Sequence, residues 1–302
     1  MSTAAYPVTT RRQNWFSLVW TRFWLYWVLI KDLQTGLLLV TAAAGYASGC
    51  CTNLNPTCML GLMGSLFFAT AGCTVLNMAF DRDIDALMLR TAHRPLPAGK
   101  ISAREAWILG GLMTALGLIW ALALDTLFGA MVAIGVVLNA LVYTIWLKRR
   151  TPFAIIIGGM AGGMPVLAGR ALASGQVDLT GLLMALGVLV WIPTHIMTFT
   201  IKYQEDYARA GIPTFPKVYG VQVTRWIIAA SSLLVVVLMQ GAAYRIGVPE
   251  GTFSGLAILG GAMLGLTALA LLRPTRALNF ALYKGASIYM LLAMILFVAG
   301  GL

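Results

Sequence analysis

The stretch Asn77-Met-Ala-Phe-Asp81-Arg-Asp83-Ile-Asp85 stands at the end of a long apolar segment. Carboxylates are costly near a bilayer, so three aspartates within five residues indicate a functional site. On a helix, Asn77, Asp81 and Asp85 are four residues apart and share one face. That face offers an amide oxygen and two carboxylates, hard ligands that suit a Mg²⁺ ion bridging to phosphate oxygens. The stretch therefore predicts a membrane helix that ends in a magnesium site.

The composition of the whole chain indicates a membrane protein. Hydrophobic residues make up 60% of the 302 residues and charged residues only 10%, and the mean hydropathy is +0.85. A helix needs about 20 residues to cross a hydrocarbon core of roughly 30 Å. Nine apolar segments are long enough, at about 24–49, 59–80, 104–124, 126–147, 153–173, 180–200, 224–245, 252–272 and 281–301. They lack the alternation of a barrel strand, so we expect an all-α membrane protein, a bundle of nine transmembrane helices.

We expect one folded domain. Residues 1–23 are predicted to form an N-terminal cytoplasmic or interfacial segment, and residues 24–302 the nine-helix domain. Two long polar connections, at about 81–103 and 201–223, follow helices of the same polarity and so lie on one side of the membrane. If their acidic residues face each other, they can hold Mg²⁺ on either side of a diphosphate.

The basic residues predict the orientation of the bundle. Nineteen of the 21 lysines and arginines lie in the N-terminal flank and the even-numbered connections, and only Arg170 and Arg245 lie near the odd-numbered ones. The positive-inside rule assigns the richer side to the cytoplasm, which places the N-terminus and the aspartates there. This topology and the attraction of anionic lipid account for the net charge of +11, so we expect the lipid bilayer, and no nucleic acid, as a partner. No cleavable targeting segment is evident, which favours the inner membrane of a prokaryotic cell.

These motifs carry a family resemblance. The Asn77, Asp81 and Asp85 pattern, followed by Arg94-Pro-Leu-Pro97, resembles the first signature of the UbiA-type intramembrane prenyltransferases. The similarity runs from about residue 28 to 300. Within the superfamily the chain most resembles the members that transfer a farnesyl group from farnesyl diphosphate to a vinyl group of protoheme IX, giving heme O. It continues through the segments 143–151, 157–162, 191–195 and 206–213 and a region with Lys284, Ser287 and Tyr289.

The resemblance implies roles for particular residues. Mg²⁺ would be bound by Asn77, Asp81 and Asp85 with Asp206 opposite, and these three aspartates would be the catalytic residues. The implied diphosphate clamps are Arg90, Arg94, Lys148 and Lys202, acting as preorganised positive charges. The implied acceptor and prenyl pocket contains His195, Tyr143, Phe199 and Tyr203, whose rings would shield a farnesyl cation from water.

Other interpretations stay open. The chain departs from the heme-farnesylating pattern at several places near the expected acceptor pocket, including Ala154, Arg170 and the residues after His195. A UbiA-type enzyme for another acceptor, such as an aromatic acid or a chlorin, is therefore the main alternative. A transporter is disfavoured, because its ionisable groups should lie mid-helix rather than at one membrane face. For the heme-farnesylating interpretation, a heme-handling partner protein that delivers the acceptor is a further expected interaction.

Some charged residues have simpler readings. Asp206 is preferred to Glu205 as the acidic ligand of the second connection, because adjacent side chains point about 100° apart on a helix. Arg150, Arg209 and Arg225 are expected to be topological anchors, and His93 is expected to be solvated.

Overall fold

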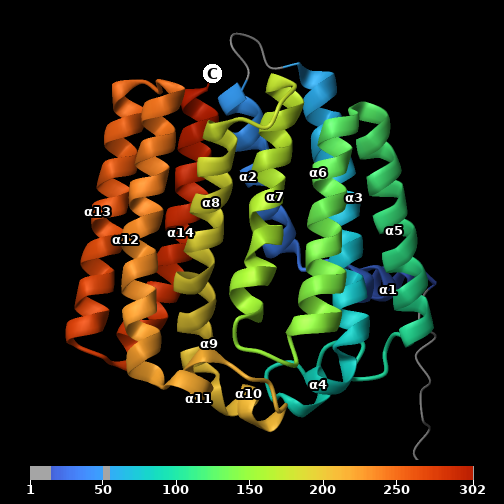
Figure 1. Cartoon of the computed structure of the whole chain (residues 1–302). Coiled ribbons are helices and arrows are strands. Elements are labelled where there is room, and N and C mark those ends of the chain that lie inside the picture. The colour runs from blue at the N-terminus through green and yellow to red at the C-terminus, as the bar shows by residue number, and fades with distance from the viewer. Residues whose placement is uncertain (1–14, 50–54, 302) are drawn as a thin grey trace, which may run out of the picture.

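The computed structural model describes residues 15–49 and 55–301, and this part of the chain contains helices and turns but no strand. The helices stand side by side as a bundle (Figure 1). Eight spans within the described residues are long and apolar enough to cross a membrane, and a bent helix pair at the start makes a ninth. The all-α, membrane-spanning fold class is thus confirmed.

The helices follow the predicted segments closely. The first half contains α1 (Trp15–Leu29), α2 (Asp32–Gly49), α3 (Pro56–Phe80), α4 (Arg82–Leu87), α5 (Ala103–Leu124), α6 (Thr126–Val137), the π-helix η1 (Leu138–Leu147) and α7 (Ala154–Ser174). The second half contains α8 (Leu179–Ile192), the π-helix η2 (Pro193–Met197), α9 (Thr198–Lys202), α10 (Gln204–Arg209), α11 (Phe215–Tyr219), α12 (Val221–Ile246), α13 (Glu250–Leu272) and α14 (Arg276–Gly300).

The first predicted segment, 24–49, is not one helix. The chain bends by 57° between α1 and α2, at Lys31, whose φ of 48° is the only positive value of a non-glycine residue in the described chain. The break leaves the carbonyl of Ile30 without a helical partner, and the Thr35 hydroxyl donates to it at 2.6 Å. Thr74 Oγ1, whose shortest acceptor is the carbonyl of Ala71 at 2.8 Å, lies 3.2 Å from the same Ile30 carbonyl. The hydrogen bond from Thr35 satisfies the buried carbonyl and so stabilises the bend. The length of the apolar segment predicts a membrane span but gives no sign that the span is bent.

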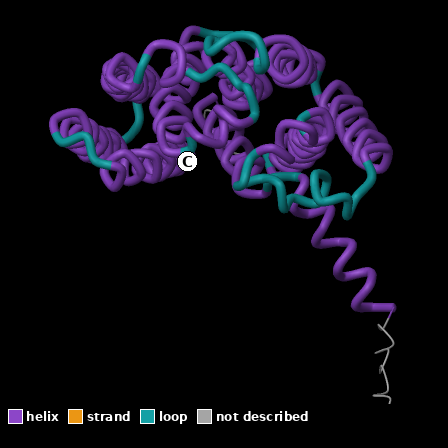
Figure 2. Tube along the Cα trace, turned by 90° about the horizontal axis from the view of Figure 1, so that it is seen from below, coloured by secondary structure: helices purple, strands orange, loops and turns teal. Residues whose placement is uncertain are grey.

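Helix α1 lies across the bundle rather than along it and projects from its side (Figures 1 and 2). The side chains of Trp15, Trp20, Phe23 and Trp24 are exposed, with Trp15 at 78% and Trp20 at 53%. Tryptophans on such a helix suit the boundary between lipid and water. The predicted boundary at residue 23 falls inside α1, and residues 1–14 lie outside the described residues.

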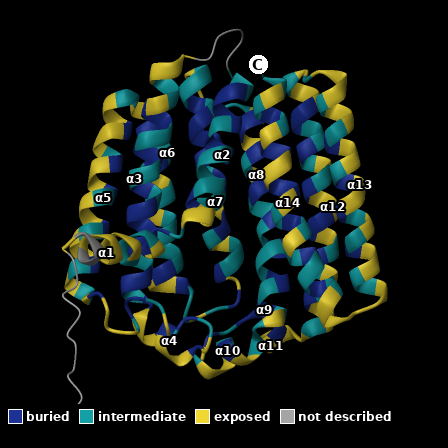
Figure 3. Cartoon of the chain, turned by 180° about the vertical axis from the view of Figure 1, so that it is seen from behind, coloured by how far each residue is buried: buried dark blue, intermediate teal, exposed yellow. Residues whose placement is uncertain are grey.

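The core runs along the inward faces of the helices, and the outward faces are exposed apolar surface (Figure 3). Two glycines permit the closest approach in this core. A Cβ on Gly45 of α2 would overlap the carbonyl of Val166 on α7, and a Cβ on Gly169 of α7 would overlap the carbonyl of Ala42 on α2. Small residues at a helix seam allow backbones to pack directly, which supports association inside a membrane.

Both acidic segments lie at one end of the bundle, which we call the motif end and which carries α4 and α10 (Figure 1). Ile84 and Met88 from the first segment pack in one buried cluster with Ile212 from the second. This apolar contact joins the two segments across the motif end.

The glycine seam gives a stability prediction. Gly45→Ala should lower the free energy of unfolding by about 1–3 kcal/mol, because the added methyl group forces α2 away from α7. Gly36→Ala, on the same helix, is the matched control, since a Cβ at Gly36 meets nothing within 4 Å. Thermal unfolding of both variants in detergent measures the difference, and equal midpoints would contradict the assigned close approach.

Candidate active site at the motif end of the bundle

The first acidic motif keeps its helical spacing although α3 ends inside it. Helix α3 stops at Phe80 and α4 begins at Arg82, yet the amide of Asp81 donates to Asn77 at 2.9 Å and the amide of Asp85 to Asp81 at 2.8 Å. Asp81 and Asp85 are buried, at 2% and 7% exposure. The three predicted ligands therefore remain on one side of a continuous turn.

Each buried carboxylate of this motif is paired with a cation. The Lys148 ammonium donates to Asp81, and Arg94 Nη1 donates to Asp85 Oδ2 at 2.8 Å. Arg149 donates twice to the exposed Asp83, at 2.7 Å each, and its hydrogen bonds hold the pKa of Asp83 below the usual range. Two predicted diphosphate clamps, Lys148 and Arg94, thus contact the predicted metal ligands directly.

Asp206 brings the second motif to the same place. Asp206 is 6% exposed, and its carboxylate accepts from the backbone amide of Leu89 at 3.1 Å, which links the two acidic segments. Arg209 Nη2 donates to Asp206 Oδ1 at 2.5 Å. The sequence analysis interpreted Arg209 only as a topological anchor and did not predict this ion pair. Glu205 is exposed, in keeping with the helical argument that preferred Asp206.

The remaining two predicted clamps lie against aromatic rings. The Arg90 guanidinium is 4.9 Å from the centre of the Phe199 ring and 5.4 Å from that of Tyr203. Lys202 Nζ lies 3.1 Å from the centre of the Phe280 ring and makes no ion pair among the described residues. Arg90 therefore lies between the acidic segments and the aromatic side chains, whereas Lys202 is not brought to the carboxylates.

Three of the four predicted pocket residues belong to one aromatic column. Trp191, His195 and Tyr283 stack in sequence with ring centres 4.7 Å apart at each step. Phe199 contacts Tyr283 at 5.4 Å and Tyr203 at 4.5 Å, and so extends the column to the rings below Arg90. The fourth residue, Tyr143, lies instead beside Lys148, whose ammonium is 5.8 Å from its ring centre.

Two π-helices present residues of the predicted site. Tyr143 and Thr144 lie in η1, and the amide of Lys148 donates to the carbonyl of Tyr143, five residues back, at 2.9 Å. His195 lies in η2, which begins at Pro193, a residue without an amide hydrogen. π-Helices frequently occur at functional sites, because the extra residue per turn redirects neighbouring side chains.

Lys31 is a site residue that the sequence analysis did not single out. Its ammonium donates to Asn77 Oδ1 at 3.5 Å, and the amide of Asn77 donates to Thr144 Oγ1 at 2.7 Å. The sequence signal for this role was a single lysine within the first apolar segment. The position of Lys31 in the sequence did not predict the bend that turns its side chain toward Asn77.

The site concentrates positive charge. Burial alone would lower the pKa of Lys148, but Tyr143 and the Asp81 carboxylate outweigh it, so the pKa is raised and the lysine stays charged. Burial raises the pKa of the Tyr207 hydroxyl, and the nearby Arg90 partly offsets the increase. The Tyr207 hydroxyl, on α10, is therefore near the positive charges of the first acidic segment. It remains protonated at neutral pH.

The donor set fits a magnesium ion. Asp81 Oδ1 is buried without a hydrogen bond in the described structure, and so is Arg90 Nε. Arg149 Nη2 lies 3.8 Å from Asp81 Oδ1, too far for a hydrogen bond, so this oxygen keeps a lone pair that can accept a metal ion, and the free Arg90 Nε–H can donate to an anion. No three His, Cys, Asp or Glu residues of the described chain are close enough to ligate one ion. Mg²⁺ usually takes only one or two carboxylates together with substrate phosphates, so this arrangement suits it.

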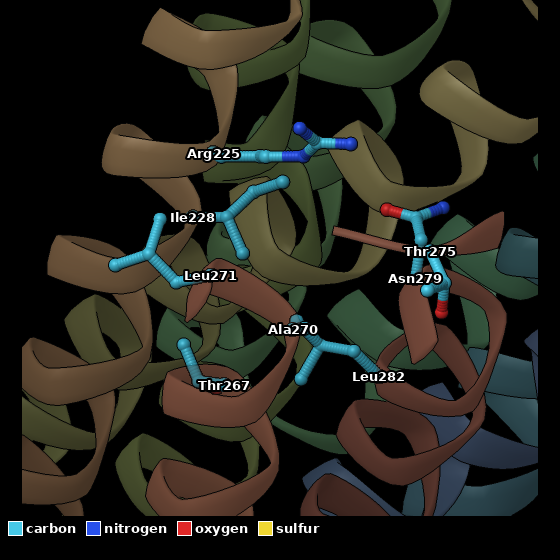
Figure 4. Close-up of a pocket in the computed structure, with 8 residues that line it drawn as sticks. All are labelled: Arg225, Ile228, Thr267, Ala270, Leu271, Thr275, Asn279 and Leu282. Atoms are coloured by element: carbon cyan, nitrogen blue, oxygen red, sulfur yellow. The ribbon is translucent and has the colours of Figure 1, made fainter. Parts of the chain in front are cut away.

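A separate small pocket lies between α12, α13 and α14 (Figure 4). Arg225, Thr275 and Asn279 line it together with apolar side chains. It contains none of the predicted ligands, clamps or aromatic residues, and we therefore place the candidate site at the paired carboxylates instead.

The Lys148 pair gives a second prediction. Lys148→Met leaves the Asp81 carboxylate buried without a full partner, which should lower the free energy of unfolding by about 3 kcal/mol. Adding Asp81→Asn to that variant should restore most of the loss. Arg150→Met, at the exposed neighbouring position, should stay within about 0.5 kcal/mol. Denaturation of the four proteins in detergent measures these changes, and a Lys148→Met protein as stable as Arg150→Met would refute the pairing.

Known proteins resemble this chain over most of its length. A protoheme IX farnesyltransferase of Korarchaeum cryptofilum is 40% identical over 210 residues, which cover 70% of this chain and 71% of that protein. A protoheme IX farnesyltransferase of Pyrobaculum arsenaticum is 35% identical over 283 residues, covering 91% and 98%.

Solved structures share the fold. A structure described as digeranylgeranylglyceryl phosphate synthase has a TM-score of 0.76 at 20% identity, covering 93% of this chain and 99% of that one. A UbiA homolog from Archaeoglobus fulgidus bound to GPP and Mg²⁺ has a TM-score of 0.68 at 18% identity, covering 91% and 99%. The model of the UbiA prenyltransferase family matches residues 37–299. The chain therefore belongs to the UbiA prenyltransferase family and is a prenyl-transferring membrane enzyme.

Proposed function

We propose that this enzyme transfers the farnesyl group of farnesyl diphosphate to a vinyl group of protoheme IX, with Mg²⁺ as cofactor. The observation that carries the proposal is the identity of 35–40% over most of the chain to proteins named protoheme IX farnesyltransferase. The geometry is consistent with it, because paired carboxylates and cations lie next to a column of aromatic rings.

The diphosphate would bind at the motif end. Asn77, Asp81 and Asp85 on one side and Asp206 on the other are the proposed ligands of Mg²⁺ ions on either side of the diphosphate. These ions would neutralise the charge that develops on the departing diphosphate. Lys148 and Arg94 contact Asp81 and Asp85 in the free protein. When a metal takes these carboxylates, both cations become available to the phosphate oxygens. Arg90 has an unpaired buried Nε atom, which makes it a third donor to the diphosphate.

The prenyl group would leave as a cation. Breaking the bond between C1 and oxygen sends the electron pair to the diphosphate, and the vinyl π electrons of the acceptor then form the new bond to C1. Water adds to the resulting cation next to the porphyrin and releases a proton, leaving a hydroxyethylfarnesyl group. Phe199 and Tyr203, below Arg90, are placed to shield the prenyl cation with their π faces.

The site is proposed to face the cytoplasm of a prokaryotic cell, with the bundle in the inner membrane. The motif end carries most of the lysines and arginines, and such residues concentrate on the cytoplasmic side. A diphosphate delivered from the cytoplasm would meet this positive surface first, while the isoprenoid chain lies in the apolar interior.

The identity of the acceptor that the enzyme prenylates is the test of this proposal. Purified enzyme with farnesyl diphosphate, protoheme IX and Mg²⁺ should release diphosphate and form a farnesylated heme, which mass spectrometry identifies. Removing Mg²⁺ with EDTA should stop the reaction, and adding it back should restore it. Parallel reactions with an aromatic acid or a chlorin should give no product. Prenylation of one of these acceptors in place of heme would overturn the proposed substrate while leaving the family assignment intact.

The two neighbouring acids of α10 provide a matched pair. Asp206→Asn should lower the transfer rate at least about a hundredfold, because a proposed ligand loses its charge where the leaving group is stabilised. Glu205→Gln, at an exposed position, should leave the rate within about twofold of the unmodified enzyme. The rates are compared by diphosphate release at saturating Mg²⁺. Similar rates for the two variants would remove Asp206 from the proposed metal site.

A further inference from the structure

The His195 side chain is fixed more firmly than packing alone requires. Its imidazole is sandwiched between Trp191, at an interplanar angle of 16°, and Tyr283, at 24°. The Trp191 indole is itself held by a hydrogen bond of 2.8 Å from Nε1 to the carbonyl of Ala286. Both faces of the imidazole are therefore covered, and only its edge remains for a ligand.

Hydrogen bonding determines which ring nitrogen of His195 carries the proton. The Ser287 hydroxyl donates its single hydrogen to the carbonyl of Tyr283 at 3.0 Å. The same oxygen lies 3.0 Å from His195 Nδ1. We assign Nδ1 as the protonated nitrogen, donating to Ser287 Oγ, because this arrangement uses the Ser287 hydrogen for Tyr283 and gives every donor an acceptor. The Nε2 atom is then the unprotonated nitrogen.

The Nε2 atom has no partner in the described structure. No hydrogen bond of the described residues reaches it, and it is not one of the buried unpaired polar atoms, so it keeps accessible surface. A neutral imidazole whose Nδ1–H is anchored and whose Nε2 is free has the arrangement of a metal-binding histidine. Such a lone pair would have no use in a pocket that binds only a hydrocarbon chain.

We propose that His195 Nε2 coordinates the iron of the porphyrin acceptor and that Ser287 is the positioning residue that orients it; this inference rests on the proposed function. The aromatic column connects His195 through Tyr283 and Phe199 to Arg90 at the diphosphate site. Coordination would fix the macrocycle next to this column, so that a vinyl group at its edge can reach the prenyl cation. The diphosphate and the acceptor would thus be held by separate residues at opposite ends of one column.

The test uses two porphyrins that differ only in the metal. The full-length protein in detergent is titrated with ferric protoheme IX and, in parallel, with metal-free protoporphyrin IX, and the absorption spectrum of each complex is recorded. His195→Ala should weaken heme binding at least tenfold and remove the spectrum of a histidine-ligated heme. Affinity for protoporphyrin IX should stay within about twofold, which also shows that the variant is folded. Added imidazole should restore the ligated spectrum.

Two further variants sharpen the test. His93→Ala is the matched control, because His93 is the only other histidine and is exposed; its heme complex should equal that of the unmodified protein. Ser287→Ala should keep the ligated spectrum but weaken heme binding about tenfold, as expected when the partner of a ligating histidine is lost.

The outcomes separate this inference from the proposed function. If His195→Ala leaves the heme spectrum unchanged, or weakens both porphyrins equally, coordination by His195 is refuted. If the unmodified protein farnesylates heme but shows no histidine-ligated spectrum, the inference fails and the proposed function stands. If the unmodified protein neither binds nor farnesylates heme, both fail.

Discussion

Three carboxylates buried at the motif end constrain this structure more than any other feature. Asp81, Asp85 and Asp206 are at most 7% exposed, and leaving water costs an ion several kcal/mol unless it is paired. Each therefore has a cationic partner: Lys148, Arg94 and Arg209, respectively. Arg94 and Arg209 lie in the same connections as their partners, whereas Lys148 reaches Asp81 from another connection and the amide of Leu89 reaches Asp206. Satisfying Asp81 and Asp206 therefore requires the ends of separate helices to meet at one place.

The rest of the bundle can be understood from this requirement. Helix α3 ends just before Asp81, and the π-helix η1 brings Thr144 to Asn77 and, just after its end, Lys148 to Asp81. The glycine seam between α2 and α7 brings two central helices into direct contact. The bend at Lys31 then directs its ammonium to Asn77.

Much of the candidate site could be predicted because the relevant signals are local. The four-residue spacing of Asn77, Asp81 and Asp85 places them on one helical face in any context, and the same periodicity distinguished Asp206 from Glu205. The contact of Arg209 with Asp206 was not predicted, because a cation near a membrane end has the same sequence signal whether it anchors a helix or pairs with a carboxylate. Lys31 and Ser287 were not assigned roles, since each depends on a contact with a distant helix rather than on its own neighbours.

The sequence by itself determined the all-helical membrane fold, the approximate bounds of the spans and the face that carries the first acidic motif. These properties follow from apolar length and helical periodicity, which act within about 20 residues. Tertiary structure alone decided which charges pair, which ring nitrogen of His195 is free and where the first span bends. Lys148 reaches Asp81 across 67 residues and Leu89 reaches Asp206 across 117. Such contacts depend on how the helices pack against one another. The local sequence is compatible with many different pairings of the same charges and does not select among them.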